Sequence, residues 1–254
     1  MLTKDDAICI RAVDYSETSQ IVTLFTRANG KVSAIAKGSK RAKSAFDGPV
    51  EMFSYGRIVF TDSTKEKLAT LTEFEQQSGL SYLAGNLFAA NCACFAAELV
   101  NSLANESDPH PGLFDSFLQF IQNIQHSKKN LDRLILLILF QLALLKEVGL
   151  QPILNACANC KTRYSAGRLT AERRDTRYEI YFSSSANGLI CRDCETAFTD
   201  KIRLSKPAAN ALNNFKLLPE SKGKTLREIE KILVYHFTEI LGKAPKMAKH
   251  ILKT

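Results

Sequence analysis

Four cysteines in two pairs form the clearest chemical signature in this chain of 254 residues. Both pairs have the form Cys-x-x-Cys, which lets the two sulfurs of one tight turn face a single ion. Thirty residues separate the pairs, a longer gap than the roughly 15–20 residues that are usual between such pairs. Two such turns supply four thiolates, the tetrahedral ligand set of structural zinc. The pattern therefore predicts one zinc ion per chain, bound by Cys157, Cys160, Cys191 and Cys194.

Two other chemistries also use paired cysteines, and both remain open. Disulfides form in an oxidising compartment, but the polar start of the chain, residues 1–6, is followed by no apolar segment that would direct export. A redox-active pair needs a thioredoxin-like βαβ context, which the surrounding pattern lacks. Four thiolates leave a zinc ion no open coordination position, so we expect a structural rather than a catalytic metal.

The remaining cysteines and the apolar pattern favour a reduced, soluble protein. Cys9, Cys92 and Cys94 lie in apolar stretches of the sequence, as reduced core residues do. The most apolar run covers only residues 134–145, whereas a helix that spans a bilayer needs about twenty apolar residues. We therefore expect a cytoplasmic protein without a membrane segment.

The net charge of +8 comes mostly from one end of the chain. Residues 200–254 contain twelve cations and five anions, so this segment alone carries +7. A basic segment of this kind suits a polyanion, although a solvated, lysine-rich helical surface gives the same charge. The last stretch, residues 243–253, is basic and amphipathic, and we expect it to expose an apolar face near Met247 and Ile251.

Residues 1–79 predict an all-β domain. The turn at Asn29-Gly30 is the strongest short-range signal for a hairpin. The five expected strands cover residues 7–13, 20–26, 31–37, 52–60 and 67–75. Five short strands in so short a segment favour a small closed barrel such as the OB-fold, although other small barrels have similar counts.

The loop after the third expected strand, residues 37–46, is the most charged feature of this domain. It holds four cations within seven residues, separated by small residues that permit close approach of a ligand. Lysine and arginine pair with phosphates, so we expect contact with nucleic acid here, with a merely solvated loop as the alternative. Nearby aromatic residues could stack on bases, but for each one a place in the barrel core is the favoured interpretation. These residues are Phe25, Phe46, Phe53 and Tyr55.

From about residue 80 the apolar period becomes helical. The expected helices cover residues 80–103, 113–124, 130–148, 206–217, 225–241 and 243–253. Residues 130–148 are apolar on nearly every side, which predicts a buried central helix, and Thr225 with Glu228 forms a capping-box pattern at a helix start. We expect residues 80–254 to form one helical domain with a zinc-binding insert at about 150–200, because the apolar stripes on both sides need each other for burial. The predicted fold class is therefore α+β, with an N-terminal five-stranded OB-fold barrel followed by this helical domain.

Short catalytic motifs are absent from the sequence. It contains no HExxH, GxSxG or GxGxxG motif and no complete P-loop, and none of its four histidines begins a zinc-deaminase motif. His236 lies on an expected helix beside Phe237 and is interpreted as a packed core residue. We therefore expect a protein that is not an enzyme.

Several longer stretches resemble the RecO family of DNA repair and recombination mediators. In the first domain they are YSETSQIVTLFT (15–26), GKV (30–32) and AKGSKRAKS (36–44). In the second domain they are LLKEVGLQP (144–152), which leads to the first cysteine pair, and GLICRDC (188–194). These stretches span almost the full chain in the family's order, which is more specific than any single motif.

The resemblance implies an N-terminal OB-fold and a helical domain that contains a four-cysteine zinc module. It also implies binding of single- and double-stranded DNA, annealing of complementary strands, and help in loading the recombinase onto DNA coated by single-strand-binding protein, in a RecF-type repair pathway. The implied partners are RecR and the acidic, apolar C-terminal tail of single-strand-binding protein. The implied location is the bacterial cytoplasm, in association with the nucleoid, and no bond-making chemistry is implied.

The resemblance and the charge pattern assign DNA contact to the same loop. The expected DNA-binding residues are Lys37, Lys40, Arg41 and Lys43, with Arg27 and Lys31 as neighbours. A second strand or the acidic partner tail is expected to bind Lys243, Lys246, Lys249 and Lys253. Two alternatives remain open: an adaptor that links single-strand-binding protein to repair partners and has only incidental DNA affinity, and a zinc-containing nucleic-acid enzyme.

Overall fold

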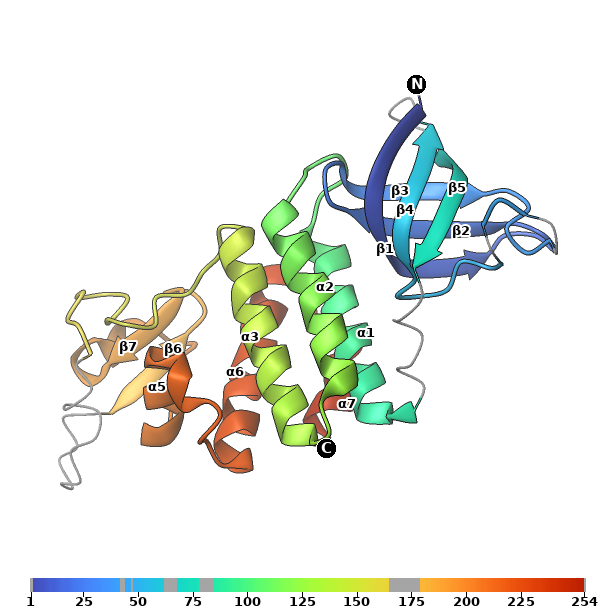
Figure 1. Cartoon of the computed structure of the whole chain (residues 1–254). Helices are drawn as coiled ribbons and strands as arrows, with labels where there is room; N and C mark the ends of the chain where they lie inside the picture. The colour runs from blue at the N-terminus through green and yellow to red at the C-terminus, as the bar shows by residue number, and fades with distance from the viewer. Residues whose placement is uncertain are drawn as a thin grey trace. The chain divides into compact units, whose positions relative to one another are not determined.

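The computed structural model of the chain describes residues 2–41, 44–46, 48–61, 68–77, 85–164 and 179–253. The chain forms two compact units, Met1–His126 and Ser127–Thr254, and each is described by itself (Figure 1). The expected starts of the fifth strand at Lys67 and of the first helix at Leu80 lie outside the described residues. The domain boundary expected after residue 79 stays a prediction, and the first compact unit also includes the two helices that follow the strands.

Five strands form a closed barrel in the first unit (Figure 1). They are β1 (Leu2–Asp14), β2 (Gln20–Thr26), β3 (Gly30–Ala36), β4 (Tyr55–Thr61) and β5 (Ala69–Gln77). Neighbouring strands are antiparallel except β3 and β5, whose parallel pairing completes the order β1-β2-β3-β5-β4. The five-stranded, OB-like barrel expected from the sequence is therefore confirmed.

Strand β2 is buried on both of its faces. Val22 and Leu24 belong to the apolar cluster that fills the barrel. Phe25 points the other way and packs against Phe114 of helix α2 (Pro111–His126), with ring centroids 5.9 Å apart. Because β2 contributes to two cores at once, apolar residues lie on both of its faces, and its polar residues Gln20, Thr23 and Thr26 are buried as well.

The β2–β3 turn is held against the segment that joins helix α1 (Leu87–Leu103) to α2. Gly30 has a φ of +67°, and a Cβ atom at this position would lie 2.4 Å from the carbonyl oxygen of Asp108. Only glycine tolerates both the backbone conformation and this close approach. Beside it, the amide of Lys31 donates a hydrogen bond to the carbonyl oxygen of Asn105 at 3.3 Å. The turn therefore attaches the barrel to the two helices of its unit.

The second unit is built around helices α3 (Asn130–Glu147) and α6 (Gly223–Leu241), which pack against each other (Figure 1). A buried polar pair crosses this contact: Nε2 of Gln141 donates a hydrogen bond to Oε1 of Glu230 at 2.8 Å. Within the described residues, Oε1 of Gln141 and Oε2 of Glu230 have no hydrogen-bond partner. Burial raises the pKa of Glu230 to about 7, because a buried carboxylate loses its hydration.

The start of α6 differs from the expected capping box. The helix begins at Gly223, so Thr225 lies inside its first turn, and Thr225 is buried. The carboxylate of Glu228 instead accepts hydrogen bonds from the amide and the hydroxyl of Ser205, both at 2.6 Å. The capping-box prediction is therefore wrong, because Glu228 instead makes a tertiary contact with Ser205, directly before α5 (Lys206–Asn213).

The remaining elements are short and surround these helices. They are the strands β6 (Ile180–Ser183), β7 (Gly188–Cys191) and β8 (Ile202–Arg203), the 3-10 helices η3 (Arg192–Ala197) and η4 (Phe215–Leu217), and helix α7 (Ala248–Leu252). The three strands form a sheet in the order β7-β6-β8. The predicted fold class, an N-terminal barrel followed by helices with a cysteine module between them, is confirmed. In the ranges that the structure describes, no helix is long and apolar enough to cross a membrane.

Candidate metal centre and nucleic-acid interface

The four cysteines of the two Cys-x-x-Cys pairs come together in the second unit. Cys157 and Cys160 follow α3, whereas Cys191 ends β7 and Cys194 lies in η3. Their Sγ atoms all lie within 4.8 Å of one another, and those of Cys160 and Cys191 are 3.7 Å apart. Thiolates at about 2.3 Å from a tetrahedral zinc ion lie about 3.8 Å apart, so the donor set fits such an ion. The predicted ligands therefore form one site that could hold a metal ion.

The first cysteine pair lies on a tight turn defined by backbone hydrogen bonds. The amide of Cys157 donates to the carbonyl oxygen of Thr162, and the amide of Lys161 donates to that of Cys157, both at 2.9 Å. Lys161 has a φ of +63°, which reverses the chain directly after Cys160. The amide of Cys191 donates to Sγ of Cys157 at 3.4 Å and so joins the two pairs. Such donors stabilise the charged thiolate, which is the form that binds a metal.

The thiols of this site differ in acidity because their surroundings differ. Cys160 is exposed, and hydrogen bonds with the side chain and then the backbone of Thr162 lower its pKa to about 6. Cys191 is partly buried, and burial raises its pKa well above the usual range of a thiol. Metal binding needs all four thiolates, so an ion at this site releases protons, and its affinity depends on pH.

The β6–β7 hairpin is tied to the segment before the first cysteine pair by close backbone contact. A Cβ atom at Gly188 would lie 2.4 Å from the carbonyl oxygen of Ile153, so only glycine fits here. The amide of Leu189 donates to the same oxygen at 2.9 Å, and the amide of Ala158 donates to the carbonyl oxygen of Leu189 at 2.7 Å. These bonds place the strand that ends in Cys191 beside the turn that carries the first pair.

His236 of α6 packs against the β6–β7 hairpin. It is buried, which confirms its interpretation as a packed core residue. Its ring meets the ring of Phe182 edge-on, with centroids 5.2 Å apart, and its Nδ1 lies 2.8 Å from the hydroxyl of Ser184. Burial lowers the pKa of His236 to about 4, so the imidazole is neutral at physiological pH. The residue therefore joins the cysteine module to α6 by packing.

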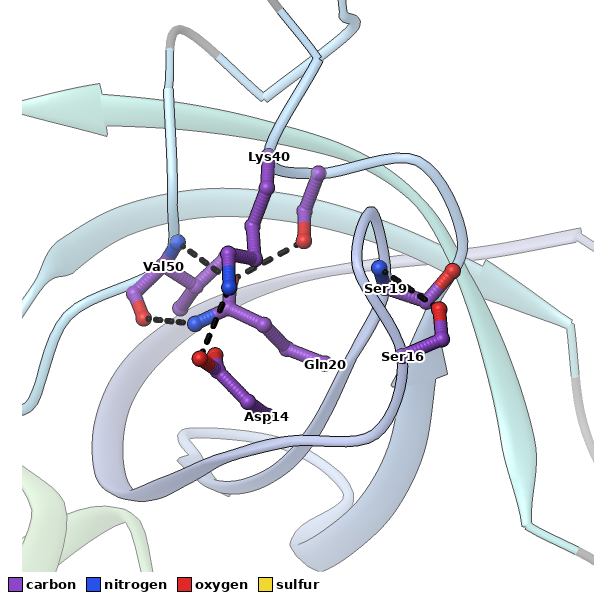
Figure 2. Close-up of polar contacts among 7 residues, drawn as sticks. Asp14, Ser16, Ser19, Gln20, Lys40 and Val50 are labelled. Carbon is purple, nitrogen blue, oxygen red and sulfur yellow. Dashed lines mark hydrogen bonds and ion pairs between the residues drawn. The ribbon is translucent and has the colours of Figure 1, made fainter.

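The basic loop, residues 37–46, begins at the end of β3, and a buried glutamine of β2 holds it to the barrel (Figure 2). Oε1 of Gln20 accepts hydrogen bonds from the hydroxyl of Ser39 and the amide of Val50, both at 2.9 Å. Nε2 of Gln20 donates to the carbonyl oxygen of Val50 at 3.2 Å. Because Gln20 is buried, it fixes the base of the loop and the segment after it relative to the barrel.

The cations of the basic loop differ in their contacts. Lys40 forms an ion pair with Asp14, with Nζ 2.7 Å from Oδ2 (Figure 2). Lys37 and Arg41 are exposed, and neither side chain forms an ion pair or a hydrogen bond within the described residues. Lys43 lies outside the described residues. Among the described residues, no acidic group therefore offsets the charge of Lys37 or Arg41, whereas Asp14 offsets the charge of Lys40.

Arg27 and Lys31 lie at the β2–β3 turn, at the opposite end of β3 from the basic loop. The guanidinium group of Arg27 forms an ion pair with Asp115 of α2 at 2.9 Å. Nζ of Lys31 donates to the carbonyl oxygen of Asn101 in the last turn of α1 at 2.7 Å, and burial lowers its pKa. The structure therefore does not bring these two cations to the loop. Their role in DNA binding stays a prediction.

Most of the aromatic residues considered for base stacking lie in the core. Phe25, Phe46 and Phe53 are buried, so none of them is free to stack on a base. Phe46 belongs to the apolar cluster inside the barrel, as expected, whereas Phe25 packs outside it against α2. Tyr55 is partly buried, with its ring close to α2. Tyr15, on the β1–β2 turn that is hydrogen-bonded to the basic loop, is an exposed aromatic residue that was not among these candidates. The only sequence signal for the exposure of Tyr15 was its position in a turn, directly after an expected strand.

The four lysines assigned to a second strand or a partner tail lie at the end of the chain and are all exposed. They are Lys243, Lys246, Lys249 and Lys253. The expected exposed apolar face at Ile251 is wrong, because Ile251 and Ala248 are each only 4% exposed. Helix α7 contacts α6, and apolar surface remains at Met247, which is partly exposed, and at Leu252, which is 36% exposed.

Comparison with known proteins gives consistent matches over almost the whole chain. Residues 1–79 match the family model described as Recombination protein O N terminal, and residues 84–250 match Recombination protein O C terminal. The chain is 30% identical to the DNA repair protein RecO of Bacillus pumilus strain SAFR-032 over 256 residues, which covers 98% of this chain and 93% of that protein. It is 28% identical to the DNA repair protein RecO of Bacillus subtilis strain 168 over 249 residues, with 95% and 91% covered. It is 31% identical to the protein of that name from Rhodopirellula baltica over 223 residues, with 87% and 77% covered.

Proposed function

Since the chain belongs to the RecO family of DNA repair proteins, we propose that it binds single- and double-stranded DNA and anneals complementary strands. The observation that carries this proposal is the basic loop, where Lys37 and Arg41 expose uncompensated charge and Gln20 holds the base in place. Cations that neutralise phosphates release counterions from the nucleic acid, which supplies affinity without sequence preference.

Annealing follows from the same electrostatics. Two phosphate chains repel each other, and a cationic surface that binds both lowers that repulsion. The exposed lysines at the chain end supply a second cationic surface. We propose that this surface receives either the second strand or the acidic C-terminal tail of single-strand-binding protein. Its residues are Lys243, Lys246, Lys249 and Lys253.

We propose that the metal of the four-cysteine site is zinc, with one ion per chain and a structural role. Thiolate ligands in a tetrahedral set suit zinc, and four of them leave no position for water or substrate. The bound ion would supply free energy of folding to a module whose core is small. The ligands would be Cys157, Cys160, Cys191 and Cys194.

We further propose a mediator role without catalysis. The chain would help to load the recombinase onto DNA coated by single-strand-binding protein, with RecR as a partner, in the bacterial cytoplasm at the nucleoid. Family membership and the lack of short catalytic motifs in the sequence support this role.

DNA binding can be tested by fluorescence anisotropy with labelled single- and double-stranded oligonucleotides at several salt concentrations. The variant Lys37→Ala/Arg41→Ala removes the two uncompensated cations, and Lys128→Ala/Lys129→Ala is a control with the same charge change on exposed residues of the second unit. We expect the loop variant to bind less tightly, with a salt slope smaller by about 0.7 per lost contact on single strands. The control should keep the wild-type slope.

Two outcomes would overturn the proposal. Wild-type protein without measurable affinity for either oligonucleotide would leave the adaptor as the better description. Equal affinity of wild type and loop variant at every salt concentration would remove the basic loop from the binding site.

A further inference from the structure

The turn that joins β1 to β2 is the part of the barrel surface to which the basic loop is attached. The amide of Lys40 donates to the carbonyl oxygen of Thr18 at 3.1 Å, and the amide of Gly38 donates to the hydroxyl of Ser19 at 3.2 Å. The ion pair between Lys40 and Asp14, which ends β1, adds a third contact (Figure 2). The basic loop and this turn are therefore direct neighbours on the barrel surface.

Tyr15 begins this turn and is 64% exposed, the highest exposure of any aromatic residue in the described ranges, where Phe215 follows at 39%. Its backbone has a fixed position, because its amide donates to the carbonyl oxygen of Ser19 at 2.9 Å. Within the described residues its hydroxyl group forms no hydrogen bond. Val13, close by at the end of β1, is 45% exposed and adds apolar surface.

We propose that Tyr15 is a stacking platform for an unpaired base of single-stranded DNA whose phosphates contact Lys37 and Arg41. A solvent-exposed aromatic ring on a turn that is hydrogen-bonded to a loop with exposed cations suits the alternation of flat bases and anionic phosphates along a single strand. Bases inside a duplex are stacked on their neighbours, so their faces are covered. Tyr15 therefore adds affinity for single strands only.

The charges around Tyr15 set the direction in which such a strand lies. Glu17 is exposed on the same turn and repels phosphate, whereas Lys37 and Arg41 on the loop attract it. The phosphates of the bound DNA strand therefore lie along the loop, and its bases face Tyr15. This inference rests on the proposed DNA binding and adds to it the contact that distinguishes unpaired from paired strands.

The first test compares affinities for a single-stranded oligonucleotide and for a duplex of the same length. Tyr15→Ala should weaken single-strand binding by about 5- to 150-fold, the range that loss of one stacked base gives, and should leave duplex binding unchanged. Its salt slope should stay at the wild-type value, because no phosphate contact is lost. Tyr15→Phe should retain the affinity, and Leu2→Ala, at a 62% exposed residue at the other end of β1, is the matched control.

A second test reports the contact directly. The chain contains no tryptophan, so Tyr15→Trp introduces a single tryptophan at the proposed platform, which can be excited at wavelengths where tyrosine does not absorb. Its fluorescence should be quenched by a single-stranded oligonucleotide and should be insensitive to a duplex. Wild-type affinity of Tyr15→Ala for single strands, or no quenching in Tyr15→Trp when the oligonucleotide is bound, would overturn the inference and leave the proposed function intact. Absence of any DNA binding by wild type would overturn both.

Discussion

Arg27 donates two hydrogen bonds to the carboxylate of Asp115, at 3.0 Å and 2.9 Å, and so joins the β2–β3 turn to helix α2. The side-chain hydrogen bond from Arg27 lowers the pKa of Asp115, and the same bond raises the pKa of Arg27. Two parallel bonds from one guanidinium group give this pair a defined geometry. The Arg27 cation is therefore already engaged within its unit, unlike Lys37 and Arg41 of the basic loop.

Arg27 and Arg41 should consequently respond differently to the same substitution. Arg27→Gln should leave affinity for DNA and its salt slope near the wild-type values, since its charge is offset by Asp115. Arg41→Gln should lower both the affinity and the slope. Anisotropy titrations of the two variants in parallel check this. Equal losses of affinity would show that phosphates compete successfully with Asp115 for Arg27.

Removing the partner of Lys40 should strengthen DNA binding. Asp14→Asn keeps the size of the side chain and removes the negative charge that lies 2.7 Å from Nζ of Lys40. Lys40 then becomes available to a phosphate, so we expect tighter binding and a salt slope steeper by about 0.7 for single strands. The double variant Asp14→Asn/Lys40→Ala is the control and should show neither the tighter binding nor the steeper salt slope. An unchanged slope in Asp14→Asn would mean that Lys40 does not contact phosphate.

Loss of a cysteine ligand should affect folding much more than DNA affinity. Cys191→Ser removes one thiolate from the four-cysteine site, so bound zinc should fall from about one ion per chain towards zero. The melting temperature should fall with it, while the folded fraction keeps its affinity for DNA. Metal analysis, thermal unfolding and anisotropy measure the three quantities. Cys94→Ser, at a cysteine outside the site, is the matched control.

The structural role of the metal would be contradicted by one combination of results. If Cys191→Ser retained the wild-type melting temperature but lost its affinity for DNA, the cysteine module would belong to the binding surface itself.

The buried Glu230 should make stability depend on pH. Its pKa is raised from 4.5 to about 7 by burial, so the folded state binds its proton more tightly than the unfolded state does. The stabilisation of the folded state that follows from this raised pKa is fully present below pH 4.5 and is lost as the pH rises through 7. Glu230→Gln removes the ionisation but keeps the hydrogen bond that Gln141 donates.

We therefore expect Glu230→Gln to gain stability relative to wild type as the pH rises from 4.5 to above 7, by an amount on the order of 3 kcal/mol. Urea unfolding of both proteins across this range measures the difference. His236 titrates with the opposite sign, because burial lowers its pKa to about 4, but its contribution is common to both proteins and cancels in the comparison. A difference that does not vary with pH would show that Glu230 titrates as an exposed carboxyl group does.

Features that depend on local geometry could be predicted from the sequence. The two-residue spacing within each cysteine pair fixes which sulfurs can share an ion, and the four predicted ligands do converge. The strands of the barrel followed from short stretches of β-type residues and from the hairpin signal at Asn29-Gly30, where Gly30 has a positive φ. Both kinds of signal depend on residues that are close in the sequence.

Contacts between distant side chains could not be predicted in this way. The sequence does not show which cations have an acidic partner in the fold. Arg27, for example, pairs with Asp115, which is 88 residues away in the sequence. The same limit explains two errors, because Glu228 accepts hydrogen bonds from Ser205, the residue that caps α5, and Ile251 packs into the core. Exposure of Tyr15 likewise follows from how the strands pair, since aromatic residues are equally typical of a barrel core.

The most direct test of the central proposal is the rate at which two complementary labelled oligonucleotides anneal at several salt concentrations. Wild type is compared with a variant that carries alanine at Lys37, Lys40, Arg41 and Lys43. We predict that wild type accelerates annealing, that the acceleration weakens as salt increases, and that the variant loses most of it. Full acceleration by the variant, or none by wild type at any salt concentration, would contradict a strand-annealing role of the basic loop.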